Sequence, residues 1–192
     1  NGEYYFYEKS NVWENERLLN FTPRALVDAR SRHRTMLPDE EYDNGPILVS
    51  KTAKALADKG VKVNLGAHGQ LQGLGAHWEL WLLQMGGMSN MEALQAATMN
   101  GANYRGMETE IGSLEERKLA DLIVLEKNPL ENIRNSESVQ YTMVNGRPYD
   151  SETMNQLGNQ PKERGEFYWE NAKYNEAFPW HEDTQSFTAP GC

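Results

Sequence analysis

A glycine-rich stretch with one histidine is the part of the chain best suited to chemistry. Residues 66–75 contain four glycines, with His68 and Gln70 between them. An imidazole nitrogen can bind a metal ion or transfer a proton near neutral pH, and glycines let the backbone approach a ligand closely. In a simpler interpretation the glycines only reverse the chain and His68 is a polar loop residue. The residue types alone leave both interpretations open.

The second candidate is the run His77-Trp78-Glu79. A zinc-protease helix needs a glutamate directly after its first histidine and a second histidine four positions after the first. Trp78 and Trp81 occupy those two positions here, so that motif is excluded. On a helix, His77 and Glu79 would point to different faces because they are two residues apart. A structural role for this pair is the favoured interpretation.

The elements around these residues indicate an α/β fold. Residues 61–65 alternate between apolar and polar side chains, which predicts a strand, and a helix that ends at a glycine precedes them. The glycine-rich stretch would then follow the carboxyl end of a strand, where α/β barrels place their active sites. The other expected elements are helices over residues 47–58, 76–85 and 91–104, a helix opened by Thr22 and Pro23, strands over residues 121–125, 139–144 and 147–149, and a strand or extended loop over residues 3–7.

Two local signals set boundaries among these elements. Ser89 followed by Glu92 fits a capping box, in which each residue bonds to the backbone N–H of the other at a helix start. Asn145-Gly146 is typical of a two-residue hairpin turn. We therefore expect a helix to begin just after Ser89 and a hairpin to join the last two strands.

The composition excludes several classes of function. A net charge of -9 without a basic stripe argues against nucleic acid and against an anionic membrane as partners. No apolar run approaches the roughly 20 residues that a membrane span needs. The one cysteine, Cys192, can form neither an internal disulfide nor a cysteine-based zinc site. His33 and His181 stand alone in polar surroundings and are predicted to be surface residues.

The order of short motifs from residue 60 to residue 133 resembles a known enzyme family. The motifs are Gly60-Val61-Lys62-Val63-Asn64-Leu65-Gly66, His77-x-Glu79-Leu80, Gly86-Gly87-Met88-Ser89, Glu92-Ala93-Leu94-Gln95-Ala96-Ala97-Thr98, Ile111-Gly112-Ser113-Leu114, Leu119-Ala120-Asp121-Leu122-Ile123-Val124-Leu125 and Asn128-Pro129-Leu130. In this order they resemble the C-terminal third of the metal-dependent amidohydrolases, in the imidazolonepropionase and enamidase-like group. Large bacterial members in which a β-propeller precedes the hydrolase are particularly similar.

The resemblance implies a distorted (β/α)8 barrel with a small β-sandwich formed from both chain ends. Residues 1–110 would be the C-terminal portion of the barrel, with residues 61–65 as its last strand. Residues 111–150 would supply strands of the sandwich, and residues 151–192 would form an extended tail rich in aromatic side chains. Because one barrel strand leaves two unpaired edges, we expect the chain to oligomerise, exchange strands or lie beside a missing segment.

The resemblance also implies a reaction. In this family the barrel binds one or two divalent metals, usually zinc, and a metal-bound water attacks an amide or cyclic C–N bond. The family's eighth strand normally ends in Gly-Thr-Asp, where the aspartate binds metal and accepts the proton of the water. This chain has Gly66-Ala67-His68 instead. We therefore expect His68 to line the site as metal ligand or base, with Gln70 and His77 as substrate contacts.

The family's other metal ligands come from strands that this sequence lacks, including the first strand with its His-x-His pair. The chain is thus expected to be a portion of a zinc hydrolase and to be inactive alone. Its expected partners are a small amide or peptide-like substrate and either the missing N-terminal barrel segment or another copy of the chain.

Two alternatives remain open. The chain could be a non-catalytic assembly module in which His68 is incidental, or a separately encoded C-terminal subunit that another chain completes. The resemblance is compatible with a bacterial periplasmic or secreted location and with the cytoplasm, so the compartment is not indicated.

Overall fold

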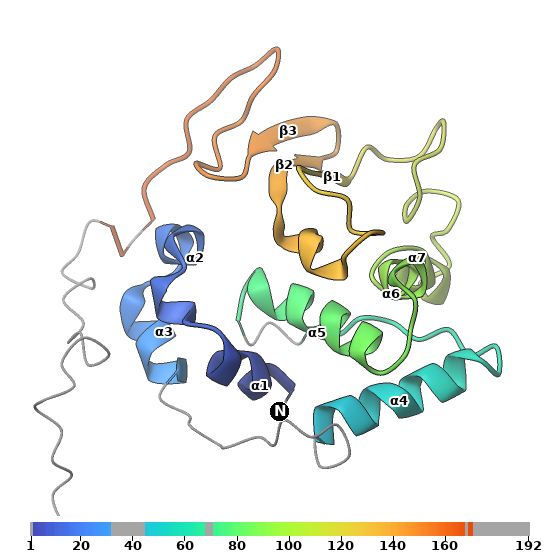
Figure 1. The fold of residues 1–192 in the computed structure, drawn as a ribbon. Coiled ribbons are helices and arrows are strands. Elements are labelled where there is room, and N and C mark those ends of the chain that lie inside the picture. Colours follow the sequence, from blue (N-terminus) through green and yellow to red (C-terminus); the bar gives the residue numbers. More distant parts are fainter. Residues whose placement is uncertain (1, 32–44, 68–70, 168, 171–192) are drawn as a thin grey trace, which may run out of the picture.

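Helix α5 (Leu74–Met85) lies at the centre of the structure, with the other elements around it (Figure 1). This computed structural model describes residues 2–31, 45–67, 71–167, 169 and 170. Apolar residues occupy several faces of α5, and Trp78, Trp81 and three leucines of the helix are buried. A helix that is apolar on several faces is stable only inside a core. Helices α1, α4 and α6 and the 3-10 helix η2 supply that core by packing against it.

The described elements combine helices with one small sheet, which confirms the predicted α/β class. Their order is α1 (Gly2–Lys9), η1 (Val12–Glu14), α2 (Glu16–Phe21), α3 (Arg24–Ser31), α4 (Gly45–Ala57), α5, α6 (Asn90–Ala96), α7 (Met99–Tyr104), β1 (Leu122–Leu125), η2 (Ile133–Glu137), β2 (Val139–Val144) and β3 (Arg147–Asp150). Among these helices, none is long and apolar enough to cross a membrane.

The start of the chain is helical, and the predicted strand or extended loop at residues 3–7 is wrong. Phe6 and Tyr7 of α1 are both buried against Trp78 of α5. The ring centroids of Phe6 and Trp78 lie 5.7 Å apart, and those of Tyr7 and Trp78 lie 5.0 Å apart in an edge-to-face arrangement. Adjacent aromatic residues favour strands only weakly, and packing on a neighbouring helix overrides that preference.

Helices α4 and α5 approach each other closely where Ser50 meets Gly86. A Cβ atom on Gly86 would lie 2.3 Å from the carbonyl carbon of Ser50, so only glycine permits this approach. Helix α4 extends over Gly45–Ala57, one residue short of its predicted end and two residues ahead of its predicted start. Gly60 follows it with a φ of 85°, as the predicted glycine stop requires.

The capping box at Ser89 is confirmed, but the helix predicted over residues 91–104 is divided. Ser89 Oγ accepts the Glu92 N–H at 3.2 Å, and a Glu92 carboxylate oxygen accepts the Ser89 N–H at 2.7 Å. Helix α6 ends at Ala96 and α7 begins at Met99. Thr98 between them has φ −134° and ψ −92°, outside the helical region, and its hydroxyl donates to the Leu94 carbonyl. Such bonding to the preceding turn disturbs helices at threonine.

Strands β1, β2 and β3 form an antiparallel meander, with β2 in the middle. Asn145 and Gly146 join β2 to β3 with φ angles of 49° and 74°, as a type I′ turn requires, so the predicted hairpin is confirmed. A bulge interrupts the pairing of β1 with β2 between Val124 and Leu125. No second sheet packs on this one within the described ranges, and the β-sandwich stays a prediction.

The strand predicted at residues 61–65 does not form, so that prediction is wrong. A strand is held by a ladder of hydrogen bonds to neighbouring strands. The sheet of the described chain lies at residues 122–150 and does not include this segment. The predicted division into residues 1–110, 111–150 and 151–192 remains a prediction. His33, His181, Cys192 and most of the predicted tail lie outside the described residues.

Candidate functional site

The segment that leads into the glycine-rich stretch is held by helices. The side-chain amide of Asn100, on α7, donates to the Val63 carbonyl at 2.9 Å. The Leu65 N–H donates to the carbonyl of Ala96, the last residue of α6, at 3.0 Å. Two backbone groups of residues 61–67 are therefore satisfied by the helices that follow it in sequence. The path of the chain before residue 66 is fixed even though no strand pairs with it.

Glu79 of α5 provides a third attachment, closer to the glycine-rich stretch. Its carboxylate accepts the Gly66 N–H at 3.0 Å. Burial raises the pKa of the Glu79 carboxyl, and the hydrogen bond from Gly66 opposes that rise. Glu79 thus fixes the backbone two residues before His68. The sequence offered one signal for this contact, which is that Glu79 and His77 must point to different helix faces.

Both ends of the turn converge on the first turn of α5. A Cβ placed on Gly75 would lie 3.9 Å from the Ala67 Cβ and 4.0 Å from the Leu71 Cβ. The Gly75 N–H donates to the Leu71 carbonyl at 2.9 Å, and Leu71 is 2% exposed. The turn therefore leaves and returns at one place on α5. His68 and Gln70, the predicted site residues, lie between these ends and outside the described residues.

His77 faces away from the turn. Its Nδ1 lies 3.1 Å from the Ser136 hydroxyl on η2, and burial, followed by the charge of Arg17, lowers the imidazole pKa. The indole N–H of Trp81 donates to the same hydroxyl at 3.0 Å. The prediction that His77 and Glu79 point to different faces is confirmed. His77 joins α5 to η2, and its predicted contact with substrate remains a prediction.

The metal predicted from the resemblance can be tested against the described side chains. No three histidine, cysteine, aspartate or glutamate side chains come together there in a way that could hold a metal ion. His77 is bonded to a serine, and Glu79 is bonded to a backbone amide. The described part of the chain does not fit a complete metal site.

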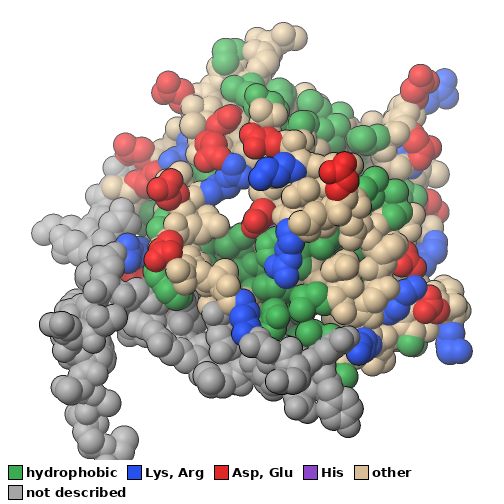
Figure 2. All heavy atoms as spheres, in the orientation of Figure 1, with side chains coloured by type: hydrophobic (Ala, Val, Ile, Leu, Met, Phe, Trp, Pro, Cys, Tyr) green, Lys and Arg blue, Asp and Glu red, His purple; other side chains and the backbone are tan. Residues whose placement is uncertain are grey.

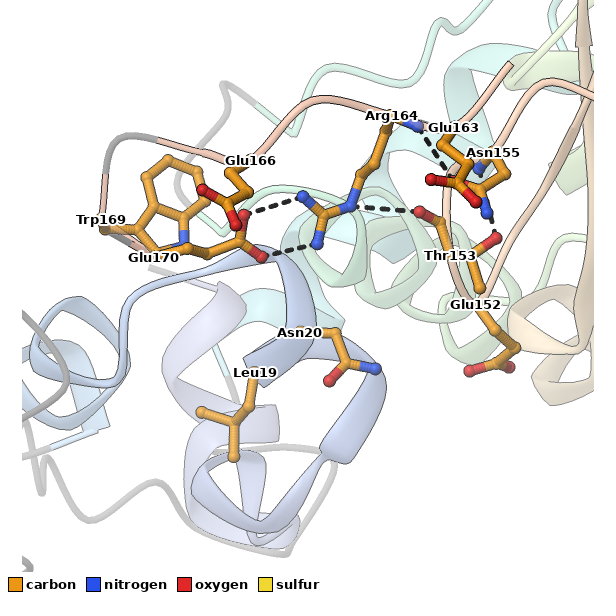
Figure 3. A pocket seen from close by; sticks show the side chains of 10 residues that line it. All are labelled: Leu19, Asn20, Glu152, Thr153, Asn155, Glu163, Arg164, Glu166, Trp169 and Glu170. Atoms are coloured by element: carbon orange, nitrogen blue, oxygen red, sulfur yellow. Dashed lines mark hydrogen bonds and ion pairs between the residues drawn. The ribbon is translucent and has the colours of Figure 1, made fainter. Parts of the chain in front are cut away.

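A large open depression of about 630 Å³ lies elsewhere, between α2 and residues 152–170. Figure 3 shows Arg164 reaching across it to Glu170, with Leu19 and Asn20 of α2 on the opposite side. The guanidinium bonds both carboxylate oxygens of Glu170, at 2.8 and 2.6 Å, and this contact lowers the Glu170 pKa to about 2. The Nε–H of Arg164 also donates to the Thr153 carbonyl. Arg164 and Glu170 therefore pair with each other, and the hydrogen bond to Thr153 attaches this segment to the residues that follow β3.

Comparison with known proteins extends the resemblance to most of the described chain. The model of the Amidohydrolase family matches residues 47–149, which include most of α4, the glycine-rich stretch, α5 and nearly all of the sheet. An imidazolonepropionase of Symbiobacterium thermophilum is 56% identical over 39 residues, covering 20% of this chain and 9% of the relative. An ochratoxinase of Aspergillus niger is 32% identical over 147 residues, covering 69% of this chain and 29% of the relative.

A solved structure agrees with these sequence matches. The structure of a Xaa-Pro dipeptidase with methionine bound in its active site is 29% identical, with a TM-score of 0.51, over 70% of this chain and 33% of the dipeptidase. The chain thus spans less than a third of the length of the curated relatives described above. Because the family match covers more than half of the sequence, this chain belongs to the amidohydrolase family.

Proposed function

We propose that this chain forms the C-terminal part of a hydrolase that cleaves an amide or cyclic amide C–N bond. The observation that carries the proposal is the attachment of the glycine-rich stretch. Glu79 binds its beginning, and Ala67 and Leu71 meet at Gly75. A turn fixed in this way can hold a reactive side chain in one place, as catalysis requires. The stretch lies inside the region that matches the family.

In this proposal His68 acts as metal ligand or base. Gln70 and His77 contact the substrate or support the groups that do, and Glu79 positions the turn. Amidohydrolases are generally metal-dependent, and we propose zinc because neutral imidazole suits it. The described residues do not complete a metal site. Further ligands would have to come from other segments of the barrel, so the chain alone is proposed to be inactive.

The proposed partners follow from the same reasoning. The substrate is a small amide or peptide-like molecule, which agrees with the dipeptidase among the structural relatives. The barrel is completed by an N-terminal segment of the parent protein or by another copy of the chain. The chain covers 29% of the ochratoxinase and 33% of the dipeptidase, which leaves room for such a segment.

Two measurements test the proposal. The isolated chain is titrated with zinc by calorimetry, and we expect neither tight stoichiometric binding nor amidase activity. In the parent protein, His68→Ala is compared with His181→Ala, a histidine predicted to lie on the surface. We expect metal content or turnover to fall in His68→Ala alone. Tight zinc binding with activity in the isolated chain, or equal behaviour of the two variants, would contradict the proposal.

A second function, assembly without catalysis, is favoured by one observation. Helix α4 packs on α5 along one side yet exposes apolar side chains on another, with Leu48 42%, Val49 70% and Leu56 46% exposed. A helix that is apolar on two faces is typical of one lying between two layers of protein. On this proposal His68→Ala leaves turnover of the parent protein unchanged, whereas Val49→Asp shifts its oligomeric state in light scattering.

A further inference from the structure

A second hollow opens between α1, η1, α5 and η2. Its volume is about 580 Å³, within the range of roughly 300–1,000 Å³ that small-molecule sites occupy. Phe6, Trp78 and Trp81 form an aromatic floor that is only 2–5% exposed, and the half-buried side chains of Tyr5 and Leu74 present apolar surface to the hollow. Figure 2 shows a hollow on this face of the molecule with hydrophobic side chains at its floor and charged side chains around it. The volume and the partly apolar lining are suited to a small organic molecule.

Arg134 places a positive charge over this floor. Its guanidinium carbon lies 4.3 Å from the ring centroid of Trp81 and 4.9 Å from that of Phe6. A guanidinium stacked on aromatic rings keeps its N–H groups at the edge of its plane, where they can bind a carboxylate. Within the part of the chain that the structure describes, this guanidinium makes no hydrogen bond or ion pair. It is partly buried, and burial lowers its pKa. A partly desolvated cation with free donors is suited to an anion.

Three of the other polar side chains of the hollow already form hydrogen bonds. Ser10 donates its hydroxyl to the Phe6 carbonyl, the Asn11 side-chain amide donates to Glu14, and the Asn15 side chain caps α2. Lys9 adds a second positive charge beside the hollow, with its Nζ 5.9 Å from the centroid of the Tyr5 ring, whereas the donors of Arg134 lie over the floor and can orient a ligand there. Their position at the edge of an aromatic floor calls for a ligand with a charged end and an apolar body.

Glu137 limits the charge of that anion. It also lines the hollow, three residues after Arg134 on η2, where residues i and i+3 lie on the same side of a 3-10 helix. Burial raises the pKa of the Glu137 carboxyl, and the positive charge of Arg134 opposes this rise. When Glu137 is ionised, the described side chains that line the hollow carry two positive charges, on Arg134 and Lys9, and one negative charge. A single carboxylate balances them, whereas a dianionic phosphate exceeds them and is repelled by Glu137.

We propose that this hollow binds a small monocarboxylate with an apolar or aromatic body. The carboxylate accepts hydrogen bonds from the edge of the Arg134 guanidinium, and the body packs on Tyr5 and Leu74 beside the aromatic floor. This site lies wholly on the described chain and needs no metal. The binding site can therefore be confirmed or refuted independently of the proposed hydrolase activity.

The test is a titration of the chain with 3-phenylpropionate, with 3-phenylpropan-1-ol as a neutral ligand of the same shape and with inorganic phosphate as a small anion. Calorimetry gives the affinity, and the indole N–H resonances of Trp78 and Trp81 report the place of binding, with Trp169 as an internal reference. We expect saturable binding of the carboxylate, at least about tenfold tighter than the alcohol because a charged hydrogen bond is lost. Phosphate should bind no better than the alcohol.

Two variants locate the anion. Arg134→Gln removes the charge and should weaken carboxylate binding by about tenfold or more, whereas Arg105→Gln, an exposed arginine after α7, should not change it. Circular dichroism checks that both variants fold. If Arg134→Gln does not fold, Arg134→Lys retains the charge but not the planar donor edge, and an intermediate affinity is expected. Equal binding of carboxylate and alcohol, equal binding of phosphate, or equal affinities of the two glutamine variants would overturn the proposal.

Discussion

The close approach of α4 to α5 makes a sharp prediction for Gly86→Ala. This glycine ends the helix that carries His77, Glu79 and the two tryptophans of the aromatic floor. Its φ is −75°, which alanine adopts freely, so the substitution introduces no backbone strain. Any loss of stability must come from the added methyl group and its contact with Ser50.

The size of that loss follows from the geometry. The added Cβ would lie 2.3 Å from the Ser50 carbonyl carbon and 2.6 Å from the carbonyl oxygen. Carbon atoms in contact are about 3.5 Å apart, so α4 would have to retreat by about 1.2 Å. The neighbour is backbone and cannot rotate away, which puts the cost near the upper end of overpacking, about 3 kcal/mol. Alanine also has less conformational freedom than glycine in the unfolded chain, which stabilises the folded state by about 0.5–1 kcal/mol.

A net loss of about 2 kcal/mol lowers the melting temperature of a chain of this length by about 4–8 °C. Thermal unfolding followed by circular dichroism measures it. Gly101→Ala is the matched control, since Gly101 lies inside α7 with nothing within 4 Å of an added Cβ. It should raise the unfolding free energy by about 0.5–1 kcal/mol. Equal melting temperatures for the two variants, or a more stable Gly86→Ala, would refute the close approach.

Three further predictions concern polar contacts. Ser89→Ala removes the capping box and should lower the free energy of unfolding in urea by about 1 kcal/mol. His77 has a pKa below its ordinary 6.5 when folded, so the unfolded chain binds more protons and stability should fall as the pH drops below about 6.5. His77→Gln should flatten that slope. Glu79→Ala should speed hydrogen exchange at the Gly66 amide by roughly threefold to tenfold, whereas Glu79→Gln keeps an acceptor and should change it less.

Each of these has a result that would contradict it. An unchanged urea midpoint for Ser89→Ala would mean that α6 does not depend on its cap. The pH slopes of the wild type and His77→Gln should be compared over the same pH range, because the raised pKa values of Glu79 and Glu137 contribute a slope of the opposite sign in both as the pH falls. A wild-type slope retained in His77→Gln would assign the effect to another group. Unaltered hydrogen exchange at the Gly66 amide in Glu79→Ala would mean that Glu79 does not hold the start of the turn.

The features that the sequence predicted correctly depend on a few neighbouring residues. The capping box at Ser89 and the hairpin at Asn145 formed as expected because each is stabilised by contacts within a few positions. The glycine stop at Gly60 is of the same kind. Local hydrogen bonds and φ preferences act the same way whatever surrounds them, so the pattern is enough to predict them.

The features that it missed depend on distant partners. The rings at Phe6 and Tyr7 suggested a strand, but their packing on Trp78, about 70 residues away in sequence, favours a helix. Residues 61–65 carry a strand pattern, but a strand also needs a neighbour with which to pair. For the candidate site, the sequence indicated the turn at His68 and showed that Glu79 points to a different helix face from His77. It did not identify Gly66 as the partner of Glu79, because the pairing spans 13 positions.

The run His77-Trp78-Glu79 shows why a motif that fails as a metal site can still matter. Consecutive positions on a helix face different directions, so these three residues attach α5 to three different neighbours. His77 meets η2, Trp78 meets α1, and Glu79 meets the backbone before the glycine-rich turn. A shift of α5 therefore moves the turn and the aromatic hollow together. Effects of Trp78 and Glu79 substitutions on stability should consequently be non-additive in a double-mutant cycle, whereas sites that do not share a rigid element usually add within about 0.5 kcal/mol.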